Sequence, residues 1–255
     1  MTDAIMTSIS NGVLTLVMNR PDKKNALTDA MYGALADAIE HAQDDASARV
    51  ILLRGEGDMF TAGNDVGEFA KVAAGGVPGP HVGRFLKALA GNAKPLIAAV
   101  QGRAVGVGTT MLLHCDLVVL AEDAVLTTPF VNLALVPEAA SSLLLPARIG
   151  HARAFAMFAL GEPVSARDAL AWGLANRLVP TADLLPTAAS LAERLAGQPL
   201  GAVIATKRLM RDAGPVAAQM EAENEQFDAR LRTDEAREAF TAFAERRAPD
   251  FSRFA

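Results

Sequence analysis

Two glycine-containing loops constrain the fold of this chain most strongly. Residues 60–65 (FTAGND) and residues 102–108 (GRAVGVG) each follow a β-like run and precede a helix-like one. A helix N-terminus leaves backbone N–H groups unpaired, and glycine allows the backbone to approach a ligand closely. The two loops, called the first and second loop below, therefore predict an α/β arrangement in which amides from both converge on one developing negative charge, as in an oxyanion hole.

Other anion-binding motifs fit these loops less well. Neither loop has the spacing of a phosphate-binding P-loop with its lysine, and the first loop lacks a dinucleotide-binding fingerprint. A thioester or another carbonyl oxygen is therefore the better candidate for the bound anion. The alternative is structural, because glycines such as Gly63 and Gly106 also serve simple turns.

The pattern along the chain supports an α/β fold, because strand-like runs alternate with helical stretches. Strands are predicted at residues 12–18, 49–53, 95–100, 117–120 and 177–179. Thr28 is predicted to cap a helix over residues 28–43, and further helices are predicted at residues 65–71 and 80–90. The Gly/Pro-rich residues 73–80 are expected to form a surface loop, with a lid as the alternative. Beyond residue 180 only helices are predicted, at residues 182–196, 200–212, 215–231 and 234–245.

Composition narrows the class of protein. With 255 residues, 51% of them hydrophobic, the chain can bury one large α/β core with or without an appendage. A net charge of −5 gives no reason to expect nucleic acid or anionic membranes as partners. The single cysteine, Cys115, cannot form an intrachain disulfide and suits a reducing compartment. Apolar runs are too short to span a bilayer and the first residues lack a signal-peptide pattern, so we expect a cytoplasmic protein.

Four motifs together carry a resemblance to a known family. Residues 19–27 (NRPDKKNAL), the first loop, residues 94–102 (KPLIAAVQG) and residues 169–179 (ALAWGLANRLV) resemble, in this order, signatures of the crotonase family, also called the enoyl-CoA hydratase/isomerase family. The resemblance implies a ClpP/crotonase-like spiral of ββα units over residues 1–195 and a helical cover and oligomerisation region over residues 196–255. It also implies acyl-CoA thioester substrates, no cofactor beyond the coenzyme A of the substrate, and a homotrimer or a hexamer.

The same resemblance implies roles for individual residues. The backbone N–H groups of Asn64 and Val107 would form the oxyanion hole and hold the thioester oxygen as an enolate. Phe243, Arg246 and Arg247 would contact a coenzyme A, either that of the same subunit or that of an adjoining one. Their alternative role is helix packing and surface charge. Further substrate or coenzyme A contacts are expected at Lys23, Lys24, Ala26, Ala62, Asp65, Val66, Gly106, Thr110 and Phe130. For the two lysines, a solvated surface pair is the alternative.

Two positions argue against a hydratase. Typical hydratases of the family place one glutamate after the second loop and another after a proline about twenty residues later. Those positions hold Thr110 and Phe130 here. Hydration requires a water to be oriented and deprotonated while C2 is protonated, and neither side chain is a competent base. Efficient hydration is therefore disfavoured.

A carboxylate follows in residues 128–142 (TPFVNLALVPEAASS). This stretch is similar to the family branch of peroxisomal-type 3-enoyl-CoA to 2-enoyl-CoA isomerases, which implies that Glu138 shuttles a proton from C2 to C4. Apolar neighbours such as Leu135 and Ala139 would raise its pKa toward neutrality if they surround it. The structural alternative places Glu138 in the first turn of a helix beginning at Pro137, where a carboxylate is favourable.

Other polar residues are given structural roles. Asp65 and Glu68 compete with Glu138 as bases, but Asp65 is expected to cap the helix after Gly63, and Glu68 is expected on its solvated face. His114, Cys115 and Asp116 are predicted to lie where a buried helix enters a strand. The remaining histidines lack metal-ligand spacing, so no metal is expected. The alternatives to an isomerase are a hydratase or other crotonase reaction, and a non-catalytic acyl-CoA-binding protein.

Overall fold

A six-stranded sheet forms the centre of the molecule in the computed structural model, which describes residues 4–65, 67–68, 76 and 79–254. The strand order is β1-β2-β3-β4-β6-β9, and only the β1–β2 pair is antiparallel. Every residue of β4 is buried, as expected for a parallel strand covered on both faces. The strands are β1 (Ile5–Ser10), β2 (Val13–Met18), β3 (Val50–Gly55), β4 (Leu96–Val100), β6 (Leu117–Ala121) and β9 (Arg177–Val179).

The five predicted strands correspond to β2, β3, β4, β6 and β9, while β1 was not predicted. Only the first residue of β1 is buried, so its sequence lacks an apolar repeat. The strand is held by a tight turn at Asn11 and Gly12, which both have positive φ. Asn-Gly is the strongest short hairpin signal in a sequence, and it could have revealed β1.

A second, smaller sheet lies beside the second loop. It consists of β5 (Arg103–Val105), β7 (Val125–Thr127) and β8 (Val164–Ser165), in the order β5-β7-β8. β5 belongs to the second loop itself, so the sheet fixes that loop in place. The strand β7 follows β6 after a short turn and pairs in parallel with β5.

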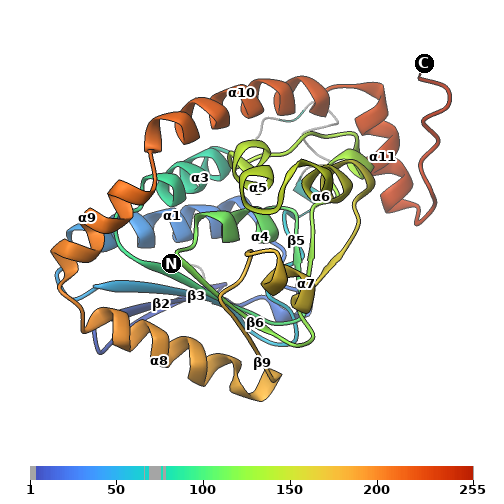
Figure 1. The fold of residues 1–255 in the computed structure, drawn as a ribbon. Coiled ribbons are helices and arrows are strands. Elements are labelled where there is room, and N and C mark those ends of the chain that lie inside the picture. Colours follow the sequence, from blue (N-terminus) through green and yellow to red (C-terminus); the bar gives the residue numbers. More distant parts are fainter. Residues whose placement is uncertain (1–3, 66, 69–75, 77–78, 255) are drawn as a thin grey trace.

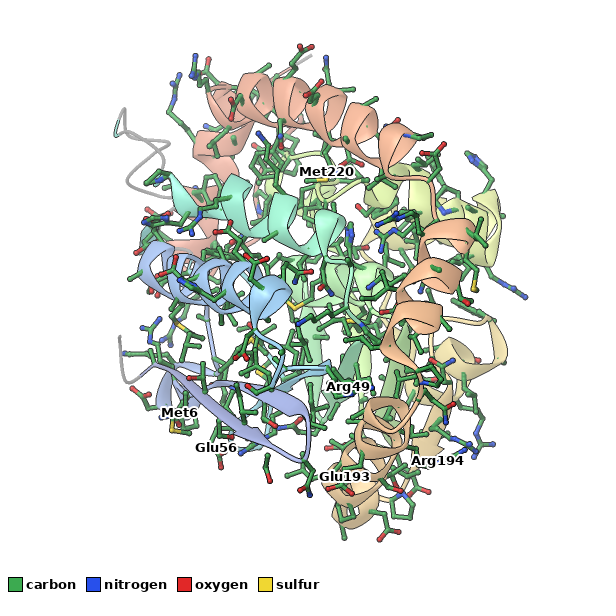
Figure 2. The ribbon with its side chains drawn as sticks, turned by 90° about the vertical axis from the view of Figure 1, so that its left-hand side faces the viewer. Met6, Arg49, Glu56, Glu193, Arg194 and Met220 are labelled. Atoms are coloured by element: carbon green, nitrogen blue, oxygen red, sulfur yellow. The ribbon has the colours of Figure 1, made fainter. Side chains whose placement is uncertain are left out.

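Helices cover both faces of the central sheet (Figure 1). On one face lie α1 (Asp29–Asp44) and α3 (His81–Gly91), and on the other lies α8 (Leu184–Ala196). A repeat of small residues lets α8 approach closely, because Ala188 and Ala192 pack against sheet residues such as Val50. At the end of α8, the Arg49 Nε donates to the Ala196 carbonyl at 2.6 Å and ties this helix to the sheet (Figure 2).

Short helices join the strands between α3 and α8. They are α4 (Val107–Thr110), η2 (Met111–His114), η3 (Val131–Leu133), α5 (Ser141–Ile149), α6 (His151–Phe155), the π-helical turn η4 (Ala156–Leu160), α7 (Ala166–Ala171) and η5 (Thr181–Asp183); η1 (Pro21–Lys23) precedes α1. The predicted helix at residues 65–71 and the predicted loop at residues 73–80 lie largely outside the described residues.

Three helices complete the chain as predicted: α9 (Leu200–Met210), α10 (Ala213–Leu231) and α11 (Asp234–Ala244). Helix α10 crosses over α3 and α5, and Met220 points from it into the core (Figures 1 and 2). Leu231 and Phe240 pack against Phe130 in a separate apolar cluster. The C-terminal helices therefore cover the side of the molecule that carries residues 130–140. None of the helices in the described part of the chain is long and apolar enough to cross a membrane.

Candidate active site

The structure brings the two glycine loops side by side. The Thr61 N–H donates to the Arg103 carbonyl at 3.1 Å, and the Val105 N–H donates to the Thr61 carbonyl at 3.1 Å. Gly63 has a φ of +85°, and a Cβ there would lie 2.6 Å from the Val105 carbonyl oxygen. A glycine is therefore required at position 63 for two reasons, its conformation and the close approach of the second loop.

The two predicted amide donors come one from each loop, Asn64 from the first and Val107 from the second. Val107 is the first residue of α4, and Gly106 precedes it with φ +56° and ψ −117°, a conformation that favours glycine. Over the described residues, no hydrogen bond from either the Asn64 N–H or the Val107 N–H to a protein acceptor is found. Both N–H groups thus lack a described protein partner, as expected for the start of a helix. Asn64 lines the two cavities described below, whereas Val107 is buried and is not among their described lining residues.

Two cavities meet at the first loop. The Glu138 cavity, of about 270 Å³, lies between α1, α3 and α10 and is lined by Tyr32, Leu86 and Glu138, among others. The Phe130 cavity, of about 320 Å³, is lined by Ala62, Gly63, Gly106, Phe130 and Arg247, among others. Asn64 and Phe227 line both cavities. A ligand that extends from one cavity into the other therefore passes the Asn64 amide.

Glu138 is the most perturbed carboxyl group of the Glu138 cavity. Only 4% of its surface is exposed, and its Oε1 has no hydrogen-bond partner among the described residues. Burial raises the pKa of Glu138 to about 8, and the nearby negative charge of Glu223 adds to the increase. Near neutral pH this side chain can thus exchange a proton with a group in the cavity.

The structural alternative for Glu138 is wrong. Helix α5 begins at Ser141 with Ala140 as its N-cap, so Glu138 lies in the turn before the helix rather than in its first turn. Ala139 and Ala140 both adopt left-handed backbone conformations, with φ values of +63° and +54°. Such conformations are unfavourable for alanine and persist only where surrounding contacts impose them. No local sequence signal indicates these conformations, because neither residue is glycine or asparagine.

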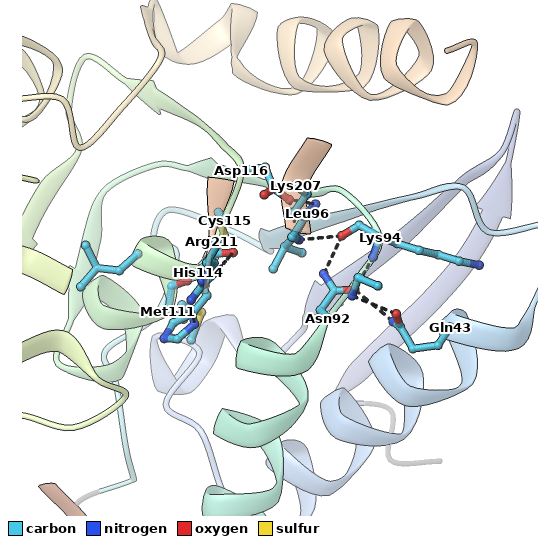
Figure 3. Close-up of polar contacts among 12 residues, drawn as sticks. Gln43, Asn92, Lys94, Leu96, Met111, His114, Cys115, Asp116, Lys207 and Arg211 are labelled. Atoms are coloured by element: carbon cyan, nitrogen blue, oxygen red, sulfur yellow. Dashed lines mark hydrogen bonds and ion pairs between the residues drawn. The ribbon is translucent and has the colours of Figure 1, made fainter. Parts of the chain in front are cut away.

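One of those contacts comes from His114 in η2. Its Nε2 lies 2.8 Å from the Ala139 carbonyl oxygen, and its Nδ1 contacts the Arg211 guanidinium (Figure 3). Because arginine only donates hydrogen bonds, Nδ1 accepts and Nε2 carries the proton. Burial, aided by the positive charge of Arg211, lowers the pKa of His114 to about 3, so the ring is neutral. The predicted position of residues 114–116 between a buried helix and a strand is confirmed.

Tyr32 is a cavity residue that the sequence analysis missed. It lies on the buried face of α1, and its hydroxyl donates to the Asn64 Oδ1. Burial, followed by the negative charges of Glu138 and Glu68, raises its pKa well above the ordinary value, so the phenol stays neutral. A lone hydroxyl on an otherwise apolar helix face was the available signal.

The two carboxylates at the end of the first loop and just after it have different surroundings. Glu68 does not lie on a solvated face as predicted, because its Oε2 accepts a hydrogen bond from the Asp29 N–H at 2.8 Å and it lines the Glu138 cavity. Asp65 accepts from the Gly67 N–H at 3.1 Å and pairs with Arg20 at 3.3 Å, which fits the expected capping role. Val66 lies outside the described residues.

The remaining predicted contact residues divide into two groups. Ala62, Gly106 and Phe130 line the Phe130 cavity, and Asp65 lines the Glu138 cavity. Lys23, Lys24, Ala26 and Thr110 are not among the described residues that line these two cavities. Lys24 is exposed and pairs with Asp58 at 2.8 Å, whereas Thr110 is fully buried. The two positions at which hydratases carry glutamate thus offer no carboxylate to either cavity. No cluster of metal-ligating side chains occurs among the described residues.

The comparisons with known proteins agree with this geometry. The family model described as enoyl-CoA hydratase/isomerase matches residues 8–253. The chain is 34% identical to 1,2-epoxyphenylacetyl-CoA isomerase of Escherichia coli K12 over 260 residues, which cover 99% of both chains. It is 32% identical to 2,3-dehydroadipyl-CoA hydratase of the same organism over 249 residues, covering 97% of this chain and 98% of that one.

A solved structure gives the same result for the fold. The enoyl-CoA hydratase/isomerase from Pseudoalteromonas atlantica T6c superposes with a TM-score of 0.92 at 42% identity, covering 98% of this chain and 100% of that chain. Similarity of this extent includes both glycine loops and the helices that cover them. The chain therefore has the crotonase fold and belongs to the enoyl-CoA hydratase/isomerase family of acyl-CoA-processing enzymes.

Proposed function

We propose that this enzyme isomerises 3-enoyl-CoA to 2-enoyl-CoA, with Glu138 as the single acid/base. The observation that carries the proposal is the buried Glu138 carboxyl group, whose Oε1 is without a protein partner among the described residues and which lines the same cavity as Asn64. The family contains isomerases and hydratases at similar identity to this chain, so the choice rests on the side chains of the site.

The proposed reaction needs one base and one site for negative charge. The Glu138 carboxylate removes a proton from C2, and the electron pair of the broken C–H bond delocalises into a dienolate. The N–H groups of Asn64 and Val107 donate to the thioester oxygen, on which charge accumulates. The Glu138 carboxyl group then returns the proton to C4, which moves the double bond into conjugation and restores the carboxylate. No atom is gained or lost overall.

The same site disfavours hydration. Adding water to a conjugated double bond needs one group to deprotonate the water and a proton source for C2. Thr110 is fully buried and donates to the Val107 carbonyl at 3.4 Å, and Phe130 has no polar side-chain atom. In hydration, Glu138 would have to deprotonate the water and also supply the proton for C2. In isomerisation, a single group takes a proton from C2 and gives it to C4, so one carboxyl group is sufficient.

Other residues complete the proposal. Ala62, Gly106 and Phe130 would contact the thioester portion of the substrate in the Phe130 cavity, and Asp65 would contact its nucleotide. Lys23, Lys24 and Ala26 would contact the adenine and phosphates at the surface. Phe243 and Arg247 line the Phe130 cavity of their own chain, which supports the proposal that they contact coenzyme A there.

The test replaces Glu138 by glutamine in deuterated water with a 3-enoyl-CoA as substrate. Glu138→Gln keeps the size and polarity of the side chain but removes the base, so we expect the turnover number to fall by about 100- to 10,000-fold. Binding of the acyl-CoA, measured by calorimetry, should stay within a few-fold of the unchanged enzyme. Mass spectrometry should find 2-enoyl-CoA as the product of the unchanged enzyme, with deuterium at C4 only to the extent that the Glu138 proton exchanges with solvent before it is returned.

Glu225→Gln is the matched control, because Glu225 is exposed on α10 and the substitution is the same. Turnover by this variant should equal that of the unchanged enzyme. Full activity in Glu138→Gln would exclude Glu138 as the base. Prompt formation of 3-hydroxyacyl-CoA from a 2-enoyl-CoA would identify a hydratase instead, and an absence of any turnover would indicate a binding protein.

A further inference from the structure

The turn that carries Glu138 is held by a residue far away in the sequence. Glu223 reaches from α10 and is itself buried. One carboxylate oxygen accepts from the Ala140 N–H at 2.6 Å, and the other accepts from the Ser142 N–H at 2.8 Å and from the Ser142 hydroxyl. The carboxylate thus binds the two unpaired amides at the start of α5, as a side-chain N-cap normally does from within the same chain segment.

The burial of Glu223 needs an explanation, because burial raises its pKa and disfavours the charged form. None of the ion pairs among the described residues involves Glu223. Its charge is balanced only by hydrogen bonds from Ala140 and Ser142, which lower its pKa, and by the positive end of α5. A simple packing contact between α10 and α5 would not require a buried carboxylate.

The conformation of the turn supplies that explanation. Ala139 and Ala140 both have positive φ, and two hydrogen bonds hold them. The neutral His114 ring donates its Nε2–H to the Ala139 carbonyl. The Glu223 carboxylate accepts from the Ala140 N–H. These hydrogen bonds are made to the two residues directly after Glu138. Releasing one of them would let the backbone relax from a conformation that is unfavourable for alanine.

We propose that Glu223 is a positioning residue for proton transfer, which holds the strained turn so that the Glu138 carboxyl group faces the cavity. The proposal rests on the proposed role of Glu138 and extends it, because it makes activity depend on the docking of α10. A displacement of about 1 Å in a reacting group can lower a rate by about a hundredfold. Loss of the Glu223 contact with Ala140, two residues from Glu138, should therefore lower turnover.

Other charged or titratable groups also face Glu138, and the test must separate them from Glu223. They share the cavity or adjoin the turn but make no contact with the Ala140 or Ser142 amides. They are Asp29 and Tyr32 from α1, Asp65 from the first loop, Glu68 just after it, Asp228 from α10, and His114 from η2 through Ala139.

The experiment compares Glu223→Gln, Glu223→Ala and the control Glu225→Gln, which alters an exposed carboxylate on the same helix. Hydrogen–deuterium exchange of a peptide spanning residues 136–143 reports on the turn without any substrate. Loss of charge-assisted hydrogen bonds should accelerate exchange there by about tenfold in both Glu223 variants. Turnover of 3-enoyl-CoA should fall about 10- to 100-fold with KM within about twofold, and Glu223→Gln should retain more activity than Glu223→Ala.

The outcomes distinguish the two proposals. Unchanged exchange in both Glu223 variants would overturn the positioning role, and so would faster exchange with unchanged turnover. A parallel loss of turnover, substrate binding and thermal midpoint in the milder Glu223→Gln would show a merely structural residue and would also overturn it. If the unchanged enzyme fails to isomerise any 3-enoyl-CoA, the isomerase proposal fails, while faster exchange in the Glu223 variants would still support the hold on the turn.

Discussion

At the scale of single residues, the site places a carboxyl group where its charged form is disfavoured. Glu138 is buried beside Glu223, and both effects raise its pKa, to about 8. The first loop contributes the Asn64 N–H, which has no described protein partner, and the Asp65 carboxylate, and Tyr32 bonds the Asn64 side chain from α1. The chemistry of the cavity therefore depends on desolvation and on amide positions, which single side-chain identities do not reveal.

The perturbed pKa of Glu138 predicts a pH-dependent effect on stability. Between pH 4.5 and about 8 the native state keeps Glu138 protonated while the unfolded chain ionises it, so native Glu138 costs stability as the pH rises through this window. Glu138→Gln removes this effect. We expect its free energy of unfolding, relative to that of the unchanged protein, to increase from pH 5 to pH 8 and then to level off.

Urea denaturation of both proteins across this pH range measures the difference directly. Glu225→Gln serves as the control, because its carboxylate is exposed and its difference from the unchanged protein should stay nearly constant. A difference for Glu138→Gln that is flat between pH 5 and pH 8 would contradict the raised pKa of Glu138.

At the scale of elements, local signals defined the helices well. Thr28 precedes α1, and its side chain accepts a hydrogen bond from the Met31 N–H at 3.4 Å, as predicted for an N-cap. Helices α3, α8, α9, α10 and α11 begin and end within about two residues of the predicted positions. The exception is the start of α5, where Pro137 and Glu138 resemble a helix start but the Glu223 contact moves it to Ser141.

The cap of α1 gives a prediction at this scale. Thr28→Ala removes the acceptor at the helix start and should lower the free energy of unfolding by about 1 kcal/mol. Thr28→Ser keeps a hydroxyl acceptor at the same position and should restore most of the loss. Urea denaturation of the three proteins at one pH measures both effects, and equal stability of the alanine and serine variants would argue against a capping role.

At the scale of the whole molecule, α9 is an exposed helix whose apolar side chains are not buried by the described part of the chain, although its Lys207 donates to the Lys94 carbonyl and pairs with Asp116. None of its residues is buried, and Leu209 and Met210 are 90% and 83% exposed. Exposed apolar groups of this kind mark interaction surfaces. The surface of α9 supports the proposal, first implied by the family resemblance, that the chain assembles into a homotrimer or a hexamer.

Sedimentation velocity tests this assembly. We expect the unchanged protein to sediment as a trimer or hexamer of its 26.7 kDa chain. The double variant Leu209→Glu and Met210→Glu should shift the population toward the monomer, because it places charges on the proposed contact surface. Ile9→Glu is the control, since Ile9 is an exposed apolar residue on β1 rather than on α9. Dissociation in both variants alike, or a monomeric unchanged protein, would contradict the role of α9.

The sequence by itself determined the features that depend on near neighbours. The period of apolar residues specified five strands of the central sheet, and a threonine specified the start of α1. The glycines at positions 63 and 106 marked the two loops, because only a residue without a side chain suits those backbone conformations and that close approach. The family resemblance then singled out Glu138 among the carboxylates.

Only the tertiary structure decided what surrounds those residues. Tyr32 meets Asn64 across 32 positions, His114 meets Ala139 across 25, and Glu223 meets Ala140 across 83. Glu68, expected on a solvated face, instead lines the cavity because α1 lies against its helix start. Propensity and periodicity describe interactions between residues a few positions apart. Burial, pKa and backbone strain at Glu138 arise from groups that meet only when the chain has packed, so the sequence could indicate the residue but not its environment.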